Sequence, residues 1–500
     1  MKLPQTLRNW ISIIGAAIAI LTLFLIALLF IITLVFDVGS SYVGLFIYII
    51  LPMFLIIGLI MIPVGMLVAK RKIKNQKAEE KAKGWPVIDF NNPATRNATI
   101  IFSTGTVILL ILSAVGSYEA FHYTESVEFC GKVCHQVMEP EYVAYQESSH
   151  ERVSCVECHV GSGADWYVKS KLSGLYQVYS VLFEKYPRPI PTPVHSLRPA
   201  RETCEECHWP EKFYDRKLRV KRSYLADESN TEWDIHMLLK TSSEHSAQGI
   251  SEGIHWHINP DVQIEYIASD EKRGVIPWVK YTNLKNGETI VYEDSENRLS
   301  QSHMDSLEVR VMDCLDCHNR PSHNYKVPQN FIDEYIVSGG ISKDLPDIKS
   351  VAMGIFTMDY STKDSAFTAI QTQVNEYYEI MYPELLESNK KDIENAIASI
   401  QEGYSKNIFP FMGASWTEYP NHLGHLETDG CYRCHNDRHT STNGKVISRD
   451  CNLCHAITAQ GTPDNLEISN VANPLEFQHP ININEVWRTE LCSTCHFQLY

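Results

Sequence analysis

The sequence predicts a mainly α-helical protein in which three transmembrane helices precede a domain with little regular sheet. Three runs without a charged residue, 10–36, 42–69 and 98–118, are each long enough to cross a bilayer, for which about 20 apolar residues suffice in a helix. After these runs, seven copies of a Cys-x-x-Cys-His motif, the first with one extra residue, use all 14 cysteines of the chain. Buried helices of a soluble core are the alternative for the apolar runs, and their crowding into the first 118 residues disfavours it.

The repeated motif is typical of covalent haem c attachment. Two thiols reach the two vinyl groups of one porphyrin, and the adjacent imidazole falls beneath the iron. A single copy would also fit a redox dithiol or half of a zinc site, but seven copies with no cysteine left over disfavour both. The cysteine pairs are Cys130/Cys134, Cys155/Cys158, Cys204/Cys207, Cys314/Cys317, Cys431/Cys434, Cys451/Cys454 and Cys492/Cys495. The histidines that follow them are His135, His159, His208, His318, His435, His455 and His496.

The amount of chain per cofactor limits the fold of the haem domain. The stretch from Tyr118 to Tyr500 gives roughly 55 residues to each of seven haems, so the haems must supply much of the buried surface. We therefore expect short helices and long loops. The formal net charge of −16 argues against nucleic acid as a partner, and an acidic surface could steer basic patches of a soluble redox partner.

Charge predicts the orientation in the membrane. The connector after the second run carries seven basic residues: Lys70, Arg71, Lys72, Lys74, Lys77, Lys81 and Lys83. The turn at 37–41 carries none, so the positive-inside rule puts the N-terminus and the connector in the cytoplasm and the haem motifs on the opposite side. The first run lacks a cleavage site and is expected to be an uncleaved anchor. Together these features predict a membrane protein whose haem domain lies on the side of the membrane opposite the cytoplasm.

Five segments are expected along the chain. Residues 1–96 hold two transmembrane helices and the basic connector, 97–124 the third helix, 125–214 a three-haem module, 215–313 a haem-free insertion, and 314–500 a four-haem module with a helical insertion. Within the haem-free insertion, Trp278–Tyr292 reads as a β-hairpin that turns at Asn286-Gly287. Helices are expected at Ser342–Phe356, Ser365–Ile380 and Lys391–Tyr404.

The segment from Trp166 to Tyr186 has apolar residues at helical spacing with lysines at its edges. Two interpretations stay open. It could lie in the membrane interface with its lysines at headgroup level, or it could pack on haem faces. Four prolines between 187 and 193 then predict an extended stretch.

Thirteen histidines lie outside the motifs, more than the irons need as second axial ligands. This surplus favours electron transfer over small-molecule reduction at an open iron. The expected distal ligands are His150, His195, His257, His323, His425, His439 and His479. His257 is preferred to His255, and His323 and His439 are expected to ligate neighbouring haems because each lies too close to its own motif. For His236, His245 and His303 a solvent or hydrogen-bonding role is preferred.

Met138 lies three residues after His135, on the same face of any helix there. On spacing alone it competes with His135 for one side of the iron, and methionine more often fills apolar gaps. Its role is therefore open at this point.

Residues 118–214 resemble the NapC/NirT/NrfH family of membrane-anchored quinol-oxidising cytochromes. The matching landmarks are Glu128-Phe129-Cys130, Cys134-His135-Gln136-Val137-Met138, Ser149-His150, Cys155 to His159, Lys169-Ser170-Lys171 and Glu202-Thr203-Cys204 to His208. The whole layout is also similar to the larger seven-haem inner-membrane cytochromes of metal-reducing bacteria. Gly253-Ile254-His255-Trp256-His257, Cys317-His318-Asn319-Arg320-Pro321 and Gly424-His425 with Gly430-Cys431 fit this second resemblance.

The resemblance implies that Met138 ligates the first haem, that His150 is a distal ligand, and that quinol binds near Lys169 or Lys171. Three departures from the family pattern stand out: the extra residue in the first motif, three haems before the gap, and no clear match for the family's acidic residue. Asp165 is the nearest acid, and His122 is a further candidate for the proton chemistry.

The expected function is quinol dehydrogenation by a seven-haem cytochrome c. Menaquinol would deliver electrons that leave to a periplasmic c-type cytochrome or periplasmic reductase, for anaerobic or extracellular respiration. One alternative is a terminal reductase of the nitrite or hydroxylamine type with an open haem iron. Another is a polymerising conductive cytochrome, which the three membrane spans disfavour. The sequence leaves a homo-oligomer open.

Overall fold

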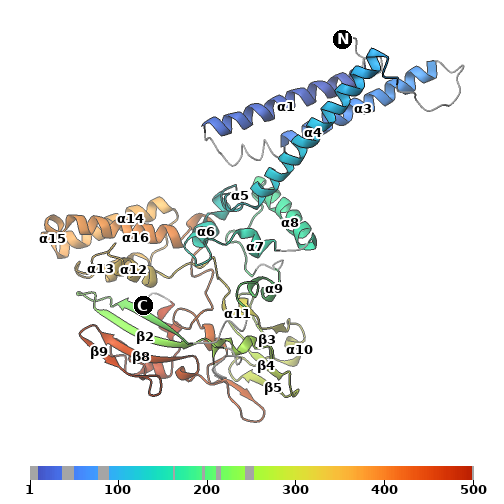
Figure 1. Ribbon diagram of the computed structural model, residues 1–500. Helices are drawn as coiled ribbons and strands as arrows, with labels where there is room; N and C mark the ends of the chain where they lie inside the picture. The colour runs from blue at the N-terminus through green and yellow to red at the C-terminus, as the bar shows by residue number, and fades with distance from the viewer. Residues whose placement is uncertain are drawn as a thin grey trace. The chain divides into compact units, whose positions relative to one another are not determined.

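The computed structural model describes residues 9–36, 50–76, 89–133, 135–161, 164–193, 198–209, 216–242 and 253–497 (Figure 1). The chain divides into two compact units, Met1–His135 and Gln136–Tyr500. Within the described residues the protein is mainly helical with two small antiparallel sheets, which confirms the predicted fold class in outline.

The first unit consists of helices. These are α1 (Trp10–Phe36), α3 (Leu51–Gln76), α4 (Pro93–Glu125) and α5 (Val127–Lys132). Trp10–Leu29, Leu51–Arg71 and Thr95–Glu125 are long and apolar enough to cross a membrane, as the three uncharged runs predict. Most of their large apolar side chains are exposed, as expected for surfaces that contact lipid. Residues 37–49 and 77–88, with the first turn and most of the connector, lie outside the described residues.

Helices α1 and α3 pack closely through glycines. A Cβ atom on Gly15 would lie 2.7 Å from the main-chain oxygen of Gly58, so only glycine permits this approach. Ser12 Oγ donates a hydrogen bond of 2.9 Å to the main-chain oxygen of Ile62, next to Pro63. This side-chain bond joins the two helices, as polar side chains do between helices in membranes.

The second unit begins with short helices that carry the early motifs. These are α6 (His135–Gln146), α7 (Cys155–His159), α8 (Ala164–Leu182) and α9 (Ala200–Cys204). Later short helices and turns are η4 (Ile254–Ile258), α10 (Gln301–Met304), α11 (Cys314–Cys317), η5 (Pro410–Met412), η6 (Gly430–Arg433), η7 (Cys451–Leu453), η8 (Val486–Arg488) and α17 (Cys492–His496). Their brevity agrees with the expectation that the haems supply much of the core.

Two antiparallel sheets connect the middle of the chain to its C-terminal part. One has the order β1 (Arg216–Tyr224), β2 (Glu232–Lys240), β8 (His455–Thr462), β9 (Asn465–Ile468). The other has the order β6 (Arg310–Val311), β3 (Val262–Ile267), β4 (Trp278–Asn283), β5 (Thr289–Asp294), β7 (His439–Ser441). The predicted hairpin is β4–β5, and Gly287 adopts a φ of +74° in its turn. The structure thus has more sheet than the one hairpin expected, because β8 and β7 add strands from the C-terminal part.

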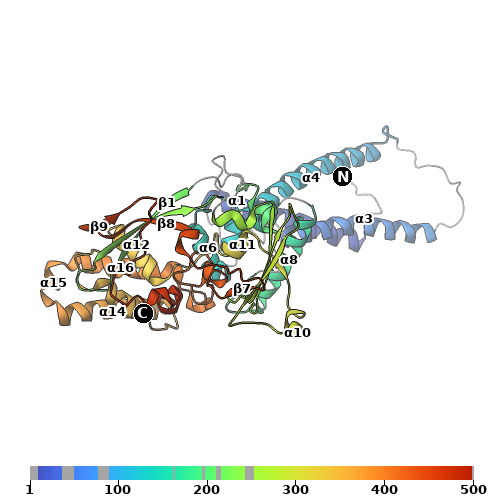
Figure 2. The same ribbon diagram turned by 90° about the horizontal axis from the view of Figure 1, so that it is seen from below.

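The helical lobe, residues 328–407, lies beside the first sheet in both views (Figures 1 and 2). It comprises α12 (Pro328–Val337), α13 (Ile348–Ile355), α14 (Lys363–Met381), α15 (Pro383–Ser388) and α16 (Lys390–Asn407). Its core is formed by side chains at helical spacing, among them Ile370, Val374 and Tyr378 of α14. The predicted helices Ser365–Ile380 and Lys391–Tyr404 correspond to α14 and α16. The first predicted helix begins only at Ile348, because Asp347 before it has a φ of +59°.

A buried ion pair joins this lobe to the first sheet. Lys349 Nζ of α13 lies 2.5 Å from Asp333 Oδ1 of α12 and also donates to the main-chain oxygen of Tyr224 at the end of β1. Asp333 Oδ1 accepts a second hydrogen bond, of 3.2 Å, from the Tyr224 amide. Both charged side chains are more than nine-tenths buried. Loss of either partner would therefore leave an uncompensated buried charge.

We predict that Lys349→Met lowers the stability of the haem domain by roughly 3–5 kcal/mol, because Asp333 keeps its burial and loses its counter-ion. The measurement is the thermal unfolding midpoint of the detergent-purified protein. Lys343→Met is the matched control, since Lys343 lies six residues earlier with an exposed side chain. Equal midpoints for the two variants would contradict a structural role for this pair.

Candidate haem-binding sites

The motif cysteines lie on short helical turns. In α7, α11 and α17 both cysteines of a motif belong to one turn, and η6 and η7 each begin or enclose the first cysteine of theirs. Residues three apart share a face of a helix, so both thiols of a motif can meet one porphyrin edge. Cys130 lies on α5, whereas Cys134 lies outside the described residues.

The variable residues inside two motifs fix the attachment turns to each other. Asp316 of α11 forms a capping box with Asp313 and accepts a hydrogen bond of 2.8 Å from Arg273. Arg433, inside the fifth motif, donates to the main-chain oxygens of Asp316 at 2.6 Å and Arg273 at 2.8 Å. The fourth and fifth motifs are therefore held together by Asp316 and Arg433, which occupy positions where the motif does not specify the residue.

Six pairs of histidines face each other in the second unit. Each pair joins one motif histidine to one histidine from outside the motifs, with ring centroids 5.8 to 6.4 Å apart. The pairs are His159–His323, His208–His150, His318–His255, His435–His257, His455–His425 and His496–His479. All six motif histidines whose side chains the structure describes are included.

This spacing fits an iron held between two imidazoles. Metal–imidazole bonds of ~2 Å on each side, plus ~1 Å from each nitrogen to its ring centre, place the two centroids about 6 Å apart. The angles between ring planes vary from 5° to 82°, as they can when coordination fixes only the axis through the iron. The residues present therefore fit haem c with two axial histidines.

Five of the expected distal histidines belong to these pairs: His150, His257, His323, His425 and His479. His323 lies opposite His159 of the second motif and not opposite His318 of the motif it follows, as predicted from its closeness to that motif. His255, which sequence reasoning passed over, faces His318. The two histidines of His255-Trp256-His257 belong to different pairs. They lie two residues apart on a 3₁₀ turn, so their side chains point in different directions, and the close spacing of two histidines was the sequence feature that could have indicated two sites.

His439 does not fit its expected role. Its side chain is fully buried, with Nδ1 3.0 Å from Asn436 Oδ1 and Nε2 2.7 Å from the main-chain oxygen of Ile276. Because both ring nitrogens have hydrogen-bond partners, no nitrogen is left for iron. His195 lies outside the described residues, and the side chain of His135 is likewise not described. Met138 is half-buried on α6, one turn after His135.

Burial favours the neutral, metal-binding form of several of the paired histidines. It lowers the pKa of His435 and of His455 to about 4, and the facing histidine adds to each shift. The pKa of His159 and of His318 is lowered by the same causes. Neutral imidazoles at these positions offer a lone pair to iron without first releasing a proton.

Residues 318–323 contribute to three of the pairs. His318 faces His255, and His323 faces His159. Between them, the main-chain oxygen of Pro321 lies 3.3 Å from Nδ1 of His150, the partner of His208. A stretch of six residues therefore positions side chains at the second, third and fourth motifs.

Described residues of the second to seventh motifs line a shared cavity of about 2270 Å³, well above the ~300–1,000 Å³ of an ordinary ligand pocket. Successive motifs are neighbours along it. Cys204 and Cys314 lie within hydrogen-bonding range of each other. Other pairs within electrostatic range are Cys158–Cys207, Cys317–Cys431, Cys431–Cys454 and Cys451–Cys492. From the second motif to the seventh, order in space thus follows order in sequence.

In the second to seventh motifs, three described cysteines do not line the cavity: Cys155, Cys434 and Cys495. In the seventh motif, Cys492 lines the cavity and Cys495 is exposed. Ser493 between them is buried and donates a hydrogen bond to Asp429, which leaves the residue two positions later on the outer side of the turn of α17. Haem attachment at these cysteines stays a prediction, based on the spacing of each motif.

Helix α8 carries the residues expected near quinol. Its apolar side chains at helical spacing are exposed, with Leu172 at 64%, Leu175 at 68% and Leu182 at 71%, and no residue of α8 lines the cavity in the described part of the chain. Lys169 Nζ lies 4.4 Å from the Trp166 ring centre. An exposed apolar face of this kind favours the interface interpretation of this helix over packing on haem faces.

The other residues expected near quinol are Lys171, His122 and Asp165. Lys171 Nζ lies 5.0 Å from the Tyr167 ring centre. His122 is exposed near the end of α4, with its ring centre 4.4 Å from that of Tyr118. The side chain of Asp165 is outside the described residues. The geometry of a complete quinol site is therefore not among the described features.

Comparison with known proteins gives a consistent picture. Residues 92–189 match the family model of the NapC/NirT cytochrome c family, N-terminal region. The chain is 43% identical over 498 residues to the cytochrome c-type protein ImcH of Geobacter sulfurreducens, covering 99% of this chain and 96% of that protein. It is 29% identical over 115 residues to the cytochrome c-type protein NrfH of Wolinella succinogenes, covering 22% of this chain and 63% of that protein. No solved structure matches the chain.

Proposed function

Because the chain belongs to the NapC/NirT family of membrane-anchored c-type cytochromes, we propose that it is a seven-haem menaquinol dehydrogenase that delivers electrons to a periplasmic acceptor. The observation that carries the proposal is the set of six facing histidine pairs. Two axial histidines per iron suit electron transfer, because they leave no open position for a small substrate. The same pairs weigh against a terminal reductase.

In this proposal each facing pair would hold the iron of one haem. His150, His255, His257, His323, His425 and His479 would be the distal ligands, and Met138 is kept from the family resemblance as the methionine that would hold the first haem. Bound haem c supplies one-electron chemistry at its iron. The protein orients each imidazole, excludes water and keeps successive attachment sites adjacent along the cavity.

At the membrane, helix α8 is proposed to lie in the interface and to form one side of the quinol site. Oxidation of menaquinol releases two electrons and two protons. Lys169 and Lys171 are hydrogen-bond donors, since an ammonium has no acceptor, and they would hold a quinol oxygen. A carboxylate or a neutral imidazole, Asp165 or His122, would accept the protons.

We place the protein in the bacterial inner membrane with its N-terminus in the cytoplasm and its haem domain in the periplasm. The basic residues after α3 support this orientation, and the acidic net charge of −16 suits a basic surface on a periplasmic cytochrome or reductase. A homo-oligomer is compatible with the proposal.

We predict that His255→Ala converts one haem to a high-spin form that binds carbon monoxide when reduced, because His318 loses its facing ligand. His439→Gln should leave the spectrum of the protein unchanged, since glutamine can keep a hydrogen bond without offering an imidazole. Absorption and EPR spectra of both purified variants make the comparison. Carbon monoxide binding to several haems of the unaltered protein would support the reductase alternative instead.

A second prediction concerns haem number. The intact mass of the denatured protein should exceed that of the polypeptide by seven haem groups, because thioether bonds survive denaturation. Changing both Cys130 and Cys134 to serine should remove one of them. A mass increase of fewer than seven haems in fully matured protein would show that at least one motif carries no haem.

A third prediction tests the quinol site. Lys169→Gln should slow reduction by a menaquinol analogue by at least about tenfold, because the quinol oxygen loses a charged donor and keeps at most a weaker, neutral one. Lys185→Gln is the matched control, as Lys185 also lies near an aromatic ring, 5.2 Å from that of Tyr179. Reduction by dithionite should be equal in both variants. If no quinol reduces the unaltered protein, the proposed dehydrogenase activity is wrong.

A further inference from the structure

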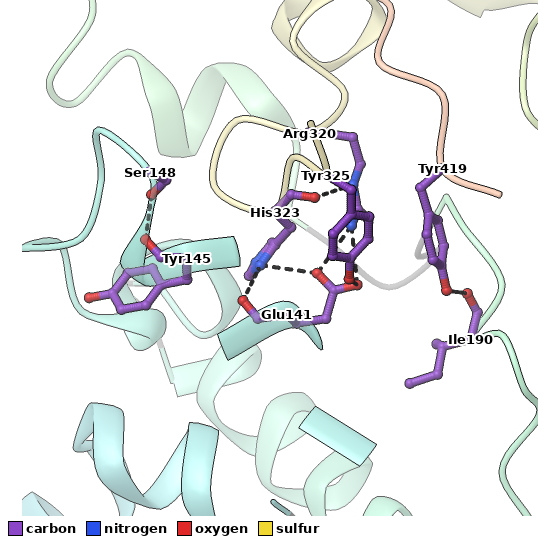
Figure 3. A network of polar contacts seen from close by, with 8 residues as sticks. All are labelled: Glu141, Tyr145, Ser148, Ile190, Arg320, His323, Tyr325 and Tyr419. Atoms are coloured by element: carbon purple, nitrogen blue, oxygen red, sulfur yellow. Dashed lines mark hydrogen bonds and ion pairs between the residues drawn. The ribbon is translucent and has the colours of Figure 1, made fainter. Parts of the chain in front are cut away.

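Glu141 of α6 stands out among the carboxylates because it contacts a proposed axial ligand. Figure 3 shows its carboxylate between His323 on one side and Arg320 and Tyr325 on the other. Nδ1 of His323 lies 3.0 Å from Oε2 of Glu141 and 3.0 Å from its main-chain oxygen. The Glu141 side chain is only 20% exposed, so solvent weakens this contact little.

This contact fixes the tautomer of His323. Both Glu141 atoms near Nδ1 are acceptors, so Nδ1 must carry the proton and donate it. Nε2 is then the nitrogen with a free lone pair, in a ring that faces His159 at 6.1 Å between centroids. The hydrogen bond thus presents His323 in the form that binds iron.

The other proposed distal ligands have a different partner at Nδ1. His150, His255, His257 and His479 each face a main-chain oxygen, at 3.3, 2.7, 2.8 and 2.9 Å. His425 has no hydrogen-bond partner for Nδ1 among the described residues. Within the described pairs, His323 is therefore the distal histidine with a carboxylate at this position.

Two further side chains hold the carboxylate in place. Arg320 Nη2 lies 3.2 Å from both oxygens of Glu141, and its guanidinium lies over the Tyr325 and Tyr419 rings, at 5.1 and 4.6 Å from their centres. The Tyr325 hydroxyl donates a hydrogen bond of 3.1 Å to Oε1. Both groups withdraw electron density from the carboxylate and so limit the charge it exerts on His323.

A carboxylate acceptor draws the Nδ1 proton more strongly than a neutral carbonyl does and makes the imidazole a better electron donor. A stronger donor stabilises the ferric iron more than the ferrous iron. We propose that Glu141 is a positioning residue that orients His323 and makes the haem at Cys155/Cys158 harder to reduce. This inference rests on the proposed ligation of that haem by His159 and His323.

The test is an EPR-monitored redox titration of the full-length holoprotein. Glu141→Gln keeps a hydrogen-bonding side chain and removes the charge, so one low-spin ferric signal should shift its midpoint upward. We expect a change of roughly tenfold in the ratio of oxidised to reduced haem, as for other groups that hydrogen-bond to metal ligands, which corresponds to ~59 mV for one electron. Glu418→Gln is the control, because the Glu418 carboxylate is likewise held in an ion pair, with Lys272 at 3.1 Å.

Tyr325→Phe provides a test of opposite sign. It removes one hydrogen bond to Glu141 and keeps the ring beneath Arg320, so more charge acts on His323 and the same midpoint should shift downward. A purely structural role of Glu141 would not produce opposite shifts in the two variants. Unchanged midpoints in both would overturn the inference.

His323→Ala separates failure of the inference from failure of the proposed function. If it changes the spectrum of one haem while Glu141→Gln and Tyr325→Phe shift no midpoint, ligation stands and the role of Glu141 is refuted. If His323→Ala leaves every haem spectrum unchanged, the proposed ligation is refuted and the inference falls with it.

Discussion

The separation of about 6 Å between facing imidazoles is the constraint on which the haem domain depends. Two imidazoles at this distance gain little from each other, and their polar nitrogens need a partner where water is excluded. In the proposed arrangement an iron between them would satisfy both nitrogens at once. Each pair would then tie two parts of the chain to one cofactor. This explains how short helical turns and two small sheets can form a domain with so little chain per haem.

The sequence predicted what is local and missed what depends on tertiary contact. The motif cysteines and histidines, the three apolar helices and the Asn286-Gly287 hairpin follow from spacing over a few residues. The facing pairs do not, because His323 and His159 are 164 positions apart and meet only in the folded chain. His255 was passed over because one ligand was expected from two nearby histidines. On a 3₁₀ turn, the side chains of residues two apart point in different directions, so His255 and His257 can face different motif histidines.

The additional strands were missed for a related reason. Strand β1, Arg216–Tyr224, alternates the apolar Leu218 and Val220 with Lys217, Arg219 and Lys221, but the run is short and both apolar side chains are exposed. The three basic residues line the cavity. The sheet is completed only when β8, more than 200 positions later, pairs with β2. A strand that lines a cofactor cavity is not required to be apolar, so hydrophobic patterning gives only a weak signal there. The prediction for His439 was wrong because the sequence does not distinguish a buried, hydrogen-bonded histidine from one that binds iron.

The hexapeptide His318–His323 supplies a ring to two pairs and a carbonyl to a third. Its length is therefore as important as its composition. Adding or removing one residue would change the register of three sites together, whereas in the turn of the β4–β5 hairpin a Cβ atom on Gly287 would meet nothing within 4 Å. During divergence of such proteins, length changes should accumulate in turns of that kind and be purged from this hexapeptide. The six-residue spacing from His318 to His323 is therefore constrained by the geometry of three histidine pairs at once.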